Sequence, residues 1–145
     1  MKKDIKVYLA APFFNAEEIR RVSTVEKILE DQGLKVWSPR LNQLKGLEPA
    51  SKEWREAVFA NDVTNIHKAD IVVAIYNGKD EGTMWELGYA YANRIPCVVL
   101  FEGWESDRMN LMISDSLHAF VGSMTELMLY DFEKMARNRF EGAMI

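Results

Sequence analysis

Three short apolar runs in this 145-residue sequence constrain the fold more than any other feature. They span residues 5–11, 71–76 and 96–101, are rich in β-branched side chains and show no polar alternation. Such runs are typical of strands that are buried on both faces, as in a parallel sheet. Two weaker candidates, residues 34–37 and 119–121, raise the expected number of strands to about five.

Helical patterns separate these runs. The first has Asn15 as its expected N-cap, Glu18 three residues later and Gly33 at its end, which are common start and stop signals. Strands that alternate with helices predict an α/β fold, a three-layer sandwich with a doubly wound parallel sheet of the flavodoxin or Rossmann type. The expected helices cover residues 16–32, 52–67 and 83–94, and a segment from Ser123 through Met135.

Length and composition exclude several classes of protein. The chain is long enough for a single domain over residues 1–145, and 48% of its residues are apolar, enough for a core. The 22 acidic residues outnumber the 18 Lys and Arg residues, which argues against binding to a nucleic-acid polymer or an anionic membrane. Without a disulfide framework, a signal peptide or a membrane-length apolar run, we expect a cytoplasmic protein.

Common cofactor and nucleophile motifs are missing from the sequence. No glycine-rich dinucleotide fingerprint follows the first strand, and neither a phosphate-binding P-loop nor a serine elbow occurs. His67 and His118 lack the spacing of metal ligands, and Cys97 lies inside an apolar run, where an inert buried thiol is expected. We therefore expect no metal and no cofactor.

Acidic residues follow the second of the three apolar runs. Asp80 and Glu81 are expected in a loop, and Glu86 in the first turn of the next helix, at the edge of the sheet where α/β proteins bind ligands. The helix N-terminus would keep Glu86 ionised and usable as a nucleophile. Thr83 and Glu86 also have the spacing of a capping box, so a purely structural role for Glu86 stays open.

Other polar and aromatic side chains are expected at the same edge. Two of them, Asn61 and Asp62, are expected at a helix end, and the others at the end of a strand or in the loop after it. Carboxylates, amides and aromatic rings with little positive charge suit a neutral, hydroxyl-rich ligand with an aromatic part, such as a sugar attached to a base. These side chains belong to Tyr8, Phe13, Phe14, Asn42, Gln43, Asn61, Asp62 and Asn110.

Several segments, in order along the chain, resemble the nucleoside 2-deoxyribosyltransferase family. They are residues 7–14, 38–43, 61–62, 82–90 and 110–117. The resemblance implies an enzyme that exchanges purine and pyrimidine bases on 2-deoxyribose. Its implied ligands are 2-deoxynucleosides and free bases, and its implied assembly is a homohexamer, a trimer of dimers with shared active sites.

The resemblance also implies roles for individual residues. Glu86 resembles a nucleophile that forms a covalent deoxyribosyl ester, so that two displacements give net retention. Asp80 resembles an acid that moves the proton of the base, Tyr8 a residue that positions the nucleophile, and Asp62 an acid that binds a sugar hydroxyl. Further substrate contacts are implied for Gln43, Phe13, Gly82, Met84 and Asn110, the last in a neighbouring subunit's site.

Two other functions compete with base exchange. A related hydrolase that cleaves 2-deoxynucleoside 5′-monophosphates needs hydroxyl groups and an Arg near the phosphate, and Ser114 and Ser116 would supply the hydroxyl groups. Asn110, where a small hydroxyl residue is expected for such an enzyme, favours a free nucleoside. The other alternative is a non-catalytic nucleotide-binding module, in which Glu86 only caps a helix.

Overall fold

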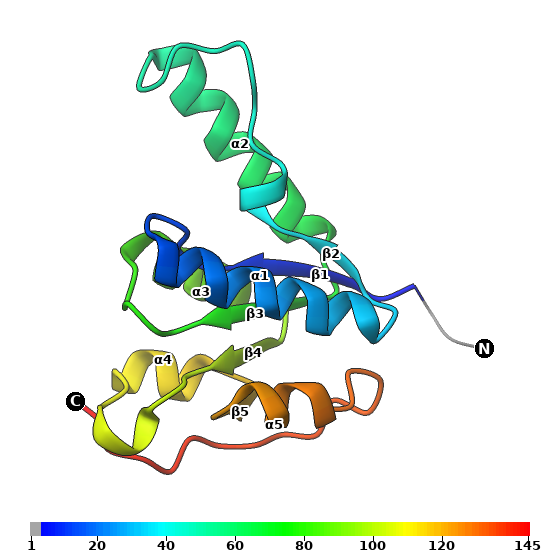
Figure 1. The fold of residues 1–145 in the computed structure, drawn as a ribbon, viewed down its shortest axis with the longest axis vertical. Coiled ribbons are helices and arrows are strands. Elements are labelled where there is room, and N and C mark those ends of the chain that lie inside the picture. The colour runs from blue at the N-terminus through cyan, green and yellow to red at the C-terminus, as the bar shows by residue number, and fades with distance from the viewer. Residues whose placement is uncertain (1–3) are drawn as a thin grey trace.

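The computed structural model describes residues 4–145 and contains one sheet of five parallel strands in the order β2-β1-β3-β4-β5 (Figure 1). Each strand lies within one of the five predicted runs, so the predicted doubly wound parallel sheet is confirmed. The strands are β1 (Lys6–Ala10), β2 (Lys35–Trp37), β3 (Ile71–Ile75), β4 (Cys97–Leu100) and β5 (Ala119–Val121).

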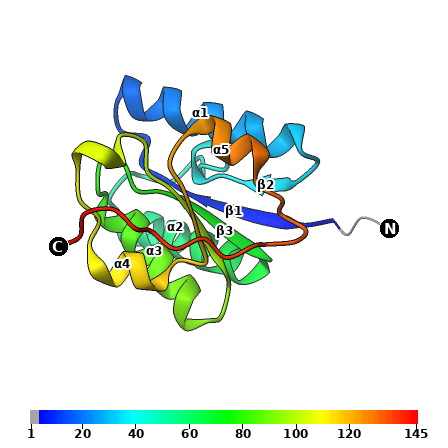
Figure 2. The same cartoon turned by 90° about the horizontal axis from the view of Figure 1, so that it is seen from below.

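Helices cover both faces of this sheet, which confirms the predicted three layers (Figure 2). Helices α1 and α5 pack on one face, and α2, α3 and α4 pack on the other. Because the β3 side chains of both faces are buried, its sequence shows no polar alternation. The helices are α1 (Ala16–Asp31), α2 (Lys52–Lys68), α3 (Glu81–Ala92), α4 (Leu111–Ser116) and α5 (Met124–Leu129).

Helix α3 begins two residues earlier than predicted. Its N-cap is Asp80, whose Oδ2 accepts a hydrogen bond of 2.9 Å from the backbone N–H of Thr83. Thr83 is therefore inside the helix, and the alternative in which Thr83 and Glu86 form a capping box is wrong. Glu86 lies in the second turn of α3, not in the first, so its side chain is free for another role.

Two further expectations were wrong, and one helix was missed. Asn61 and Asp62 lie in the middle of α2, because that helix is continuous from Lys52 to Lys68. Helix α5 ends at Leu129 and does not reach Met135, because the Asp131 carboxylate accepts two backbone N–H groups and forms a turn there. The short helix α4 was not predicted from the sequence.

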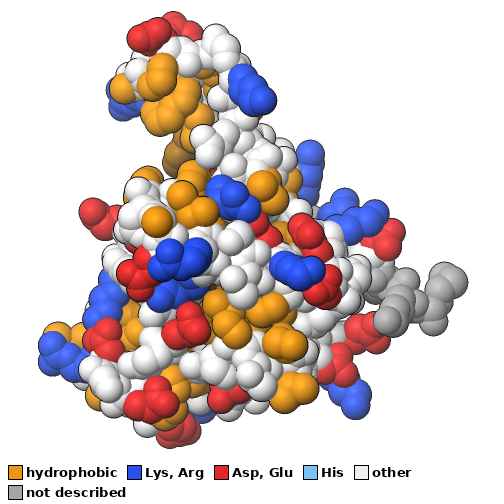
Figure 3. Space-filling model, in the orientation of Figure 1, with side chains coloured by type: hydrophobic (Ala, Val, Ile, Leu, Met, Phe, Trp, Pro, Cys, Tyr) orange, Lys and Arg blue, Asp and Glu red, His pale blue; other side chains and the backbone are white. Residues whose placement is uncertain are grey.

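The first half of α2 and the loop before it project beyond the sheet and its other helices (Figure 1). Hydrophobic side chains gather on this projection in the space-filling view (Figure 3). Two of the large exposed apolar side chains of the molecule, Leu44 and Phe59, belong to it. None of the helices within residues 4–145 is long and apolar enough to cross a membrane.

Candidate active site

A cavity of about 530 Å³ lies where the loops after β1, β2 and β3 meet α2 and α3. Its apolar walls include Phe13 and Phe14 after β1, Trp54 and Phe59 on α2, and Trp85 on α3. The ring of Phe59 meets the ring of Trp85 edge-on, with centroids 5.5 Å apart. The polar side chains of the cavity belong to Asn42, Gln43, Asn61, Asp62, Asp80 and Glu86.

Glu86 is held in the cavity by a hydrogen bond from a buried tyrosine. The hydroxyl of Tyr8 donates to Oε2 of Glu86 across the gap between β1 and α3. Tyr8 is fully buried, and its ring stacks on Trp37 of β2 with centroids 5.3 Å apart. Since packing fixes the tyrosine ring, its hydroxyl orients the carboxylate and leaves Oε1 of Glu86 available.

The electrostatics of Glu86 are dominated by burial. Burial raises the pKa of Glu86 to about 7, the hydrogen bond from Tyr8 lowers that pKa, and the charges of Asp62 and Asp80 raise it. Burial also raises the pKa of Asp62 to about 6. The expectation that the helix N-terminus keeps Glu86 fully ionised therefore needs correction, because Glu86 lies in the second turn and burial prevails.

Tyr8 remains a hydrogen-bond donor at every working pH. Burial and the neighbouring Glu86 carboxylate raise the pKa of Tyr8 far above its ordinary value. A neutral phenol donates to a carboxylate, and this bond becomes stronger when the carboxylate is charged. The pair therefore stabilises the form of Glu86 that can act as a nucleophile.

Asp80 caps α3 and lines the cavity at the same time. Its Oδ2 accepts from the backbone N–H of Thr83 at 2.9 Å and from Oγ1 of Thr83 at 2.7 Å. Within residues 4–145, Oδ1 of Asp80 forms no hydrogen bond, and Gly82 lines the cavity beside it. The cap fixes one oxygen of this carboxylate and leaves the other for a ligand.

The segment after β2 adds two amides to the cavity. Nδ2 of Asn42 donates to the carbonyl oxygen of Ser38 at 2.8 Å, and Nε2 of Gln43 donates to that of Arg40 at 3.3 Å. Nδ2 of Asn61 on α2 reaches the carbonyl oxygen of Asn42 at 3.4 Å. These bonds fold the amide side chains onto their own segment and link it to α2.

Two predicted substrate contacts lie outside the cavity lining. Met84 packs into the apolar cluster between the sheet and the helices α2, α3 and α4. The side chain of Asn110 caps α4 by accepting from the backbone N–H of Met112 at 2.8 Å, and the backbone N–H of Asn110 donates to the hydroxyl of Tyr76 at 2.9 Å. The other predicted site residues either line the cavity or, in the case of Tyr8, contact Glu86.

The structure adds walls that the sequence interpretation missed. Phe59 and Leu44 line the cavity, and neither was named as a site residue. A usable signal was present on α2, where Trp54, Val58 and Asp62 are spaced four residues apart and so share one face of the helix. That face carries both apolar walls and a carboxylate.

The charge of the cavity is negative. Its lining contains Asp62, Asp80 and Glu86, and no Lys, Arg or His among the residues that the structure describes. A phosphate group would find no cationic partner in this lining, whereas a neutral ring with hydroxyl groups would meet aromatic walls, amides and carboxylates. The arrangement can supply one oriented nucleophile and one further acid beside it.

Tyr8→Phe is expected to raise the pKa of Glu86 above about 7, by roughly one pH unit, because the hydrogen bond that stabilises the charged carboxylate is lost. A carboxyl-carbon NMR titration measures this pKa, with Tyr76→Phe as the matched control.

The stability of the folded chain depends on the same titration. The pKa of Glu86 is raised in the folded chain, so the contribution of this residue to stability decreases as pH rises from about 4.5 to 7. In Tyr8→Phe that decrease should extend to higher pH; an unchanged Glu86 titration would contradict the role of the bond.

Comparisons with known proteins agree on one family. The model of the family described as nucleoside 2-deoxyribosyltransferase matches residues 7–134. The nucleoside deoxyribosyltransferase of Lactobacillus johnsonii is 31% identical over 98 residues, 63% of this chain and 63% of that protein. The nucleoside deoxyribosyltransferase of Limosilactobacillus fermentum is 34% identical over 108 residues, 66% of this chain and 64% of that protein. The chain thus spans less than two thirds of the length of these curated relatives.

A solved structure agrees over almost the whole chain. The structure of a 2-deoxyribosyltransferase from the psychrotolerant bacterium Bacillus psychrosaccharolyticus superposes with a TM-score of 0.87 at 42% sequence identity. The superposition covers 93% of this chain and 98% of that chain.

Proposed function

The chain belongs to the nucleoside 2-deoxyribosyltransferase family, and we propose that it transfers 2-deoxyribose from one nucleobase to another. The observation that carries this proposal is the Tyr8–Glu86 pair at one end of an acidic, aromatic-walled cavity. A carboxylate that is oriented, buried and partly ionised at neutral pH is suited to nucleophilic attack on a sugar.

The first half of the reaction forms an ester. Oε1 of the ionised Glu86 bonds to the anomeric carbon of the deoxyribose while the bond from that carbon to the base nitrogen breaks. The electron pair of the broken bond leaves with the base, and Asp80 supplies or relays the proton that neutralises it. Because a 2-deoxy sugar lacks the electron-withdrawing hydroxyl beside the reacting carbon, the oxocarbenium-like transition state is easier to reach.

The second half regenerates the carboxylate. A nitrogen of the incoming base attacks the anomeric carbon, the ester bond to Glu86 breaks, and Asp80 receives the proton of that nitrogen. Two inversions at one carbon give net retention, as in retaining glycosidases. Asp62 would hold a sugar hydroxyl, and Gln43 together with Phe13 and Gly82 would contact the substrate. Met84, which packs in the apolar cluster outside the cavity lining, is given no such role.

Transfer competes with hydrolysis of the same ester. Water must stay away from the anomeric carbon until the second base has entered, and a base that fills the cavity achieves this. The rings of Trp54, Phe59 and Trp85 supply apolar walls for it. These walls support transfer as the main reaction.

A hydrolase for 2-deoxynucleoside 5′-monophosphates is the second candidate. Ser114, one of its two candidate hydroxyl residues, is buried on α4, so its hydroxyl is poorly placed to bind a phosphate. The cavity lining also has no cation among the described residues. Both observations favour the free nucleoside over the monophosphate.

The proposal includes an assembly of identical subunits. Asn110 lies outside the cavity of its own chain and is proposed to reach a sugar hydroxyl in a neighbouring subunit. Exposed apolar side chains on α4, among them Leu111 and Met112, support contact with another chain. A homohexamer built as a trimer of dimers would share its active sites in this way.

Incubation of the protein with thymidine and adenine is expected to yield deoxyadenosine and thymine. Chromatography measures both products. Thymine with free deoxyribose would instead identify a hydrolase. A parallel reaction with thymidine monophosphate should be slower by about tenfold or more, because burying a phosphate without a cationic partner is unfavourable. Faster cleavage of the monophosphate would favour the second candidate, and no reaction with either would favour a non-catalytic module.

A further inference from the structure

Glu26 on α1 is a buried carboxylate that the proposed reaction does not use. Only 4% of its surface is exposed, and it does not line the cavity. Its Oε2 accepts from Oγ of Ser38 at 2.7 Å and from Nε of Arg40 at 3.2 Å, and its Oε1 accepts from Nη2 of Arg40. Three donors from one short segment therefore converge on a single carboxylate.

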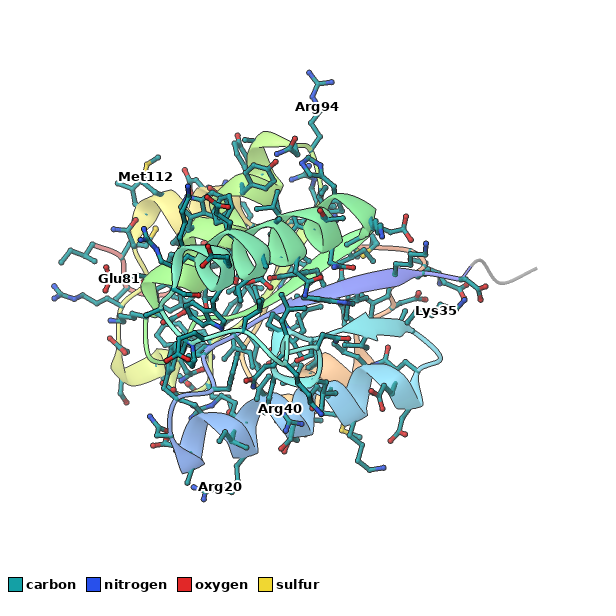
Figure 4. The ribbon with its side chains drawn as sticks, turned by 90° about the horizontal axis from the view of Figure 1, so that it is seen from above. Arg20, Lys35, Arg40, Glu81, Arg94 and Met112 are labelled. Atoms are coloured by element: carbon teal, nitrogen blue, oxygen red, sulfur yellow. The ribbon has the colours of Figure 1, made fainter. Side chains whose placement is uncertain are left out.

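Stabilisation of the fold alone does not explain why a charged Glu26 is buried against Arg40. Removing a carboxylate and a guanidinium from water is costly, and well-packed apolar side chains of similar volume often stabilise a fold equally well. The pair fixes the positions of Ser38 and Arg40 relative to α1, because a planar guanidinium and a hydroxyl can both bond to one carboxylate only in a narrow range of positions. The contact joins α1 to the 3₁₀ turn at Pro39–Leu41, and Arg40 lies beside α1 in the view from above (Figure 4).

The same turn carries the amides of the cavity. The side chain of Asn42 bonds to the carbonyl of Ser38, and the side chain of Gln43 bonds to the carbonyl of Arg40. The two residues that Glu26 holds are thus the two that orient these amides. A displacement of the turn would move both amides relative to Asp80 and Glu86.

Little else anchors this segment. Strand β2, which precedes it, has only three residues and lies at the edge of the sheet. The residues after it, 41–46, are exposed, and within the described residues 4–145 one long hydrogen bond, between Asn61 and Asn42, links the segment to α2. The contact of Ser38 and Arg40 with Glu26, in contrast, involves a buried carboxylate.

We propose that Glu26 is a positioning residue: through Ser38 and Arg40 it holds Asn42 and Gln43 where they bind the nucleobase. This inference rests on the proposed function and adds a specificity-determining contact outside the cavity. Because Glu26 does not touch the sugar or Glu86, its loss should weaken base binding and leave the acid–base chemistry of the reaction intact.

The test is Glu26→Gln, which keeps the side-chain shape but loses the charge and the strong bonds to Arg40. We expect the KM for adenine as the acceptor to rise about tenfold while kcat changes less than about threefold, as for a displaced binding group. The pH dependence of kcat should be unchanged. Glu30→Gln, at an exposed position one turn later on α1, is the matched control and should behave like the unaltered chain.

A second variant distinguishes a loss of base binding from a loss of the fold. Combining Glu26→Met with Arg40→Leu removes both charges and keeps apolar volume, so the chain should remain stable, as circular dichroism and thermal melting can verify. We expect the same rise in KM for this double variant. A merely structural role predicts a normal KM in any variant whose melting temperature is normal, and that result would overturn the proposal.

A binding measurement separates this inference from the proposed function. Trp54 and Trp85 line the cavity, so adenine binding should change tryptophan fluorescence without turnover. If the unaltered chain exchanges no bases, the proposed function fails, but about tenfold weaker adenine binding in both variants still supports the positioning role. Equal adenine affinity in the variants and the unaltered chain would overturn it.

Discussion

Glu86→Ala is expected to lower the rate of base exchange by roughly 10⁴-fold or more, because the reaction loses the atom that forms the intermediate. The expected product pattern is a loss of both deoxyadenosine and thymine from thymidine and adenine. Glu81→Gln is the matched control, since Glu81 is an exposed acid of the same helix five residues earlier. That control should retain nearly the full rate.

The intermediate itself gives a second readout. Rapid acid quench of the unaltered chain with thymidine should leave a fraction of the protein heavier by one deoxyribosyl group, detected by mass spectrometry and mapped to the peptide that contains Glu86. Glu86→Ala should show no such adduct. Exchange at a near-normal rate in Glu86→Ala, or an adduct on another peptide, would refute the assignment of the nucleophile.

Glu86→Gln separates loss of activity from loss of the fold, because the charged carboxylate is unfavourable for folding at high pH. The pKa of Glu86 is raised to about 7 in the folded chain, so its ionisation above that pH disfavours the folded state. Glu86→Gln removes that penalty and should raise the free energy of unfolding at pH 8 by about 1–3 kcal/mol. An inactive variant that is more stable than the unaltered chain identifies a functional group and not a structural one.

The fold was largely predictable because its strongest signals are local. Strands β1, β3 and β4 each have a short apolar run rich in β-branched residues, and the N-cap Asn15 with the stop at Gly33 bounds α1. The start of α3 was misplaced because Asp80 and Thr83 are both good N-cap residues three positions apart. Only the position of the helix relative to β3 selects between them, and that is a property of the whole fold.

The site was predictable in part for a related reason. Residues that directly follow strands, such as Phe13 and Asp80, line the cavity because parallel strands end at one edge. Phe59 lies on the projecting half of α2, whose direction no local pattern specifies. Glu26 left a readable signal, since it occupies the same stripe of α1 as Val22 and Leu29, where a charge must find a partner.

Asp80→Asn is expected to lower the rate of base exchange by roughly 10²-fold or more while leaving the stability of α3 unchanged. Asparagine caps helices about as well as aspartate, because its amide oxygen can accept the backbone N–H of Thr83. It cannot exchange a proton with the base. The substitution therefore separates the two roles that the carboxylate of Asp80 combines, the cap through Oδ2 and the free oxygen Oδ1 in the cavity.

Two comparisons make the separation quantitative. Asp80→Ala removes cap and acid together, so it should match Asp80→Asn in rate but lose about 1 kcal/mol of stability, measured by denaturant unfolding. The charge of Asp80 also raises the pKa of Glu86, so in Asp80→Asn the acidic limb of the pH–rate profile should move to lower pH. If Asp80→Asn exchanged bases at a normal rate and only Asp80→Ala were impaired, the carboxylate would be a helix cap alone, and the proton of the base would have to come from another group.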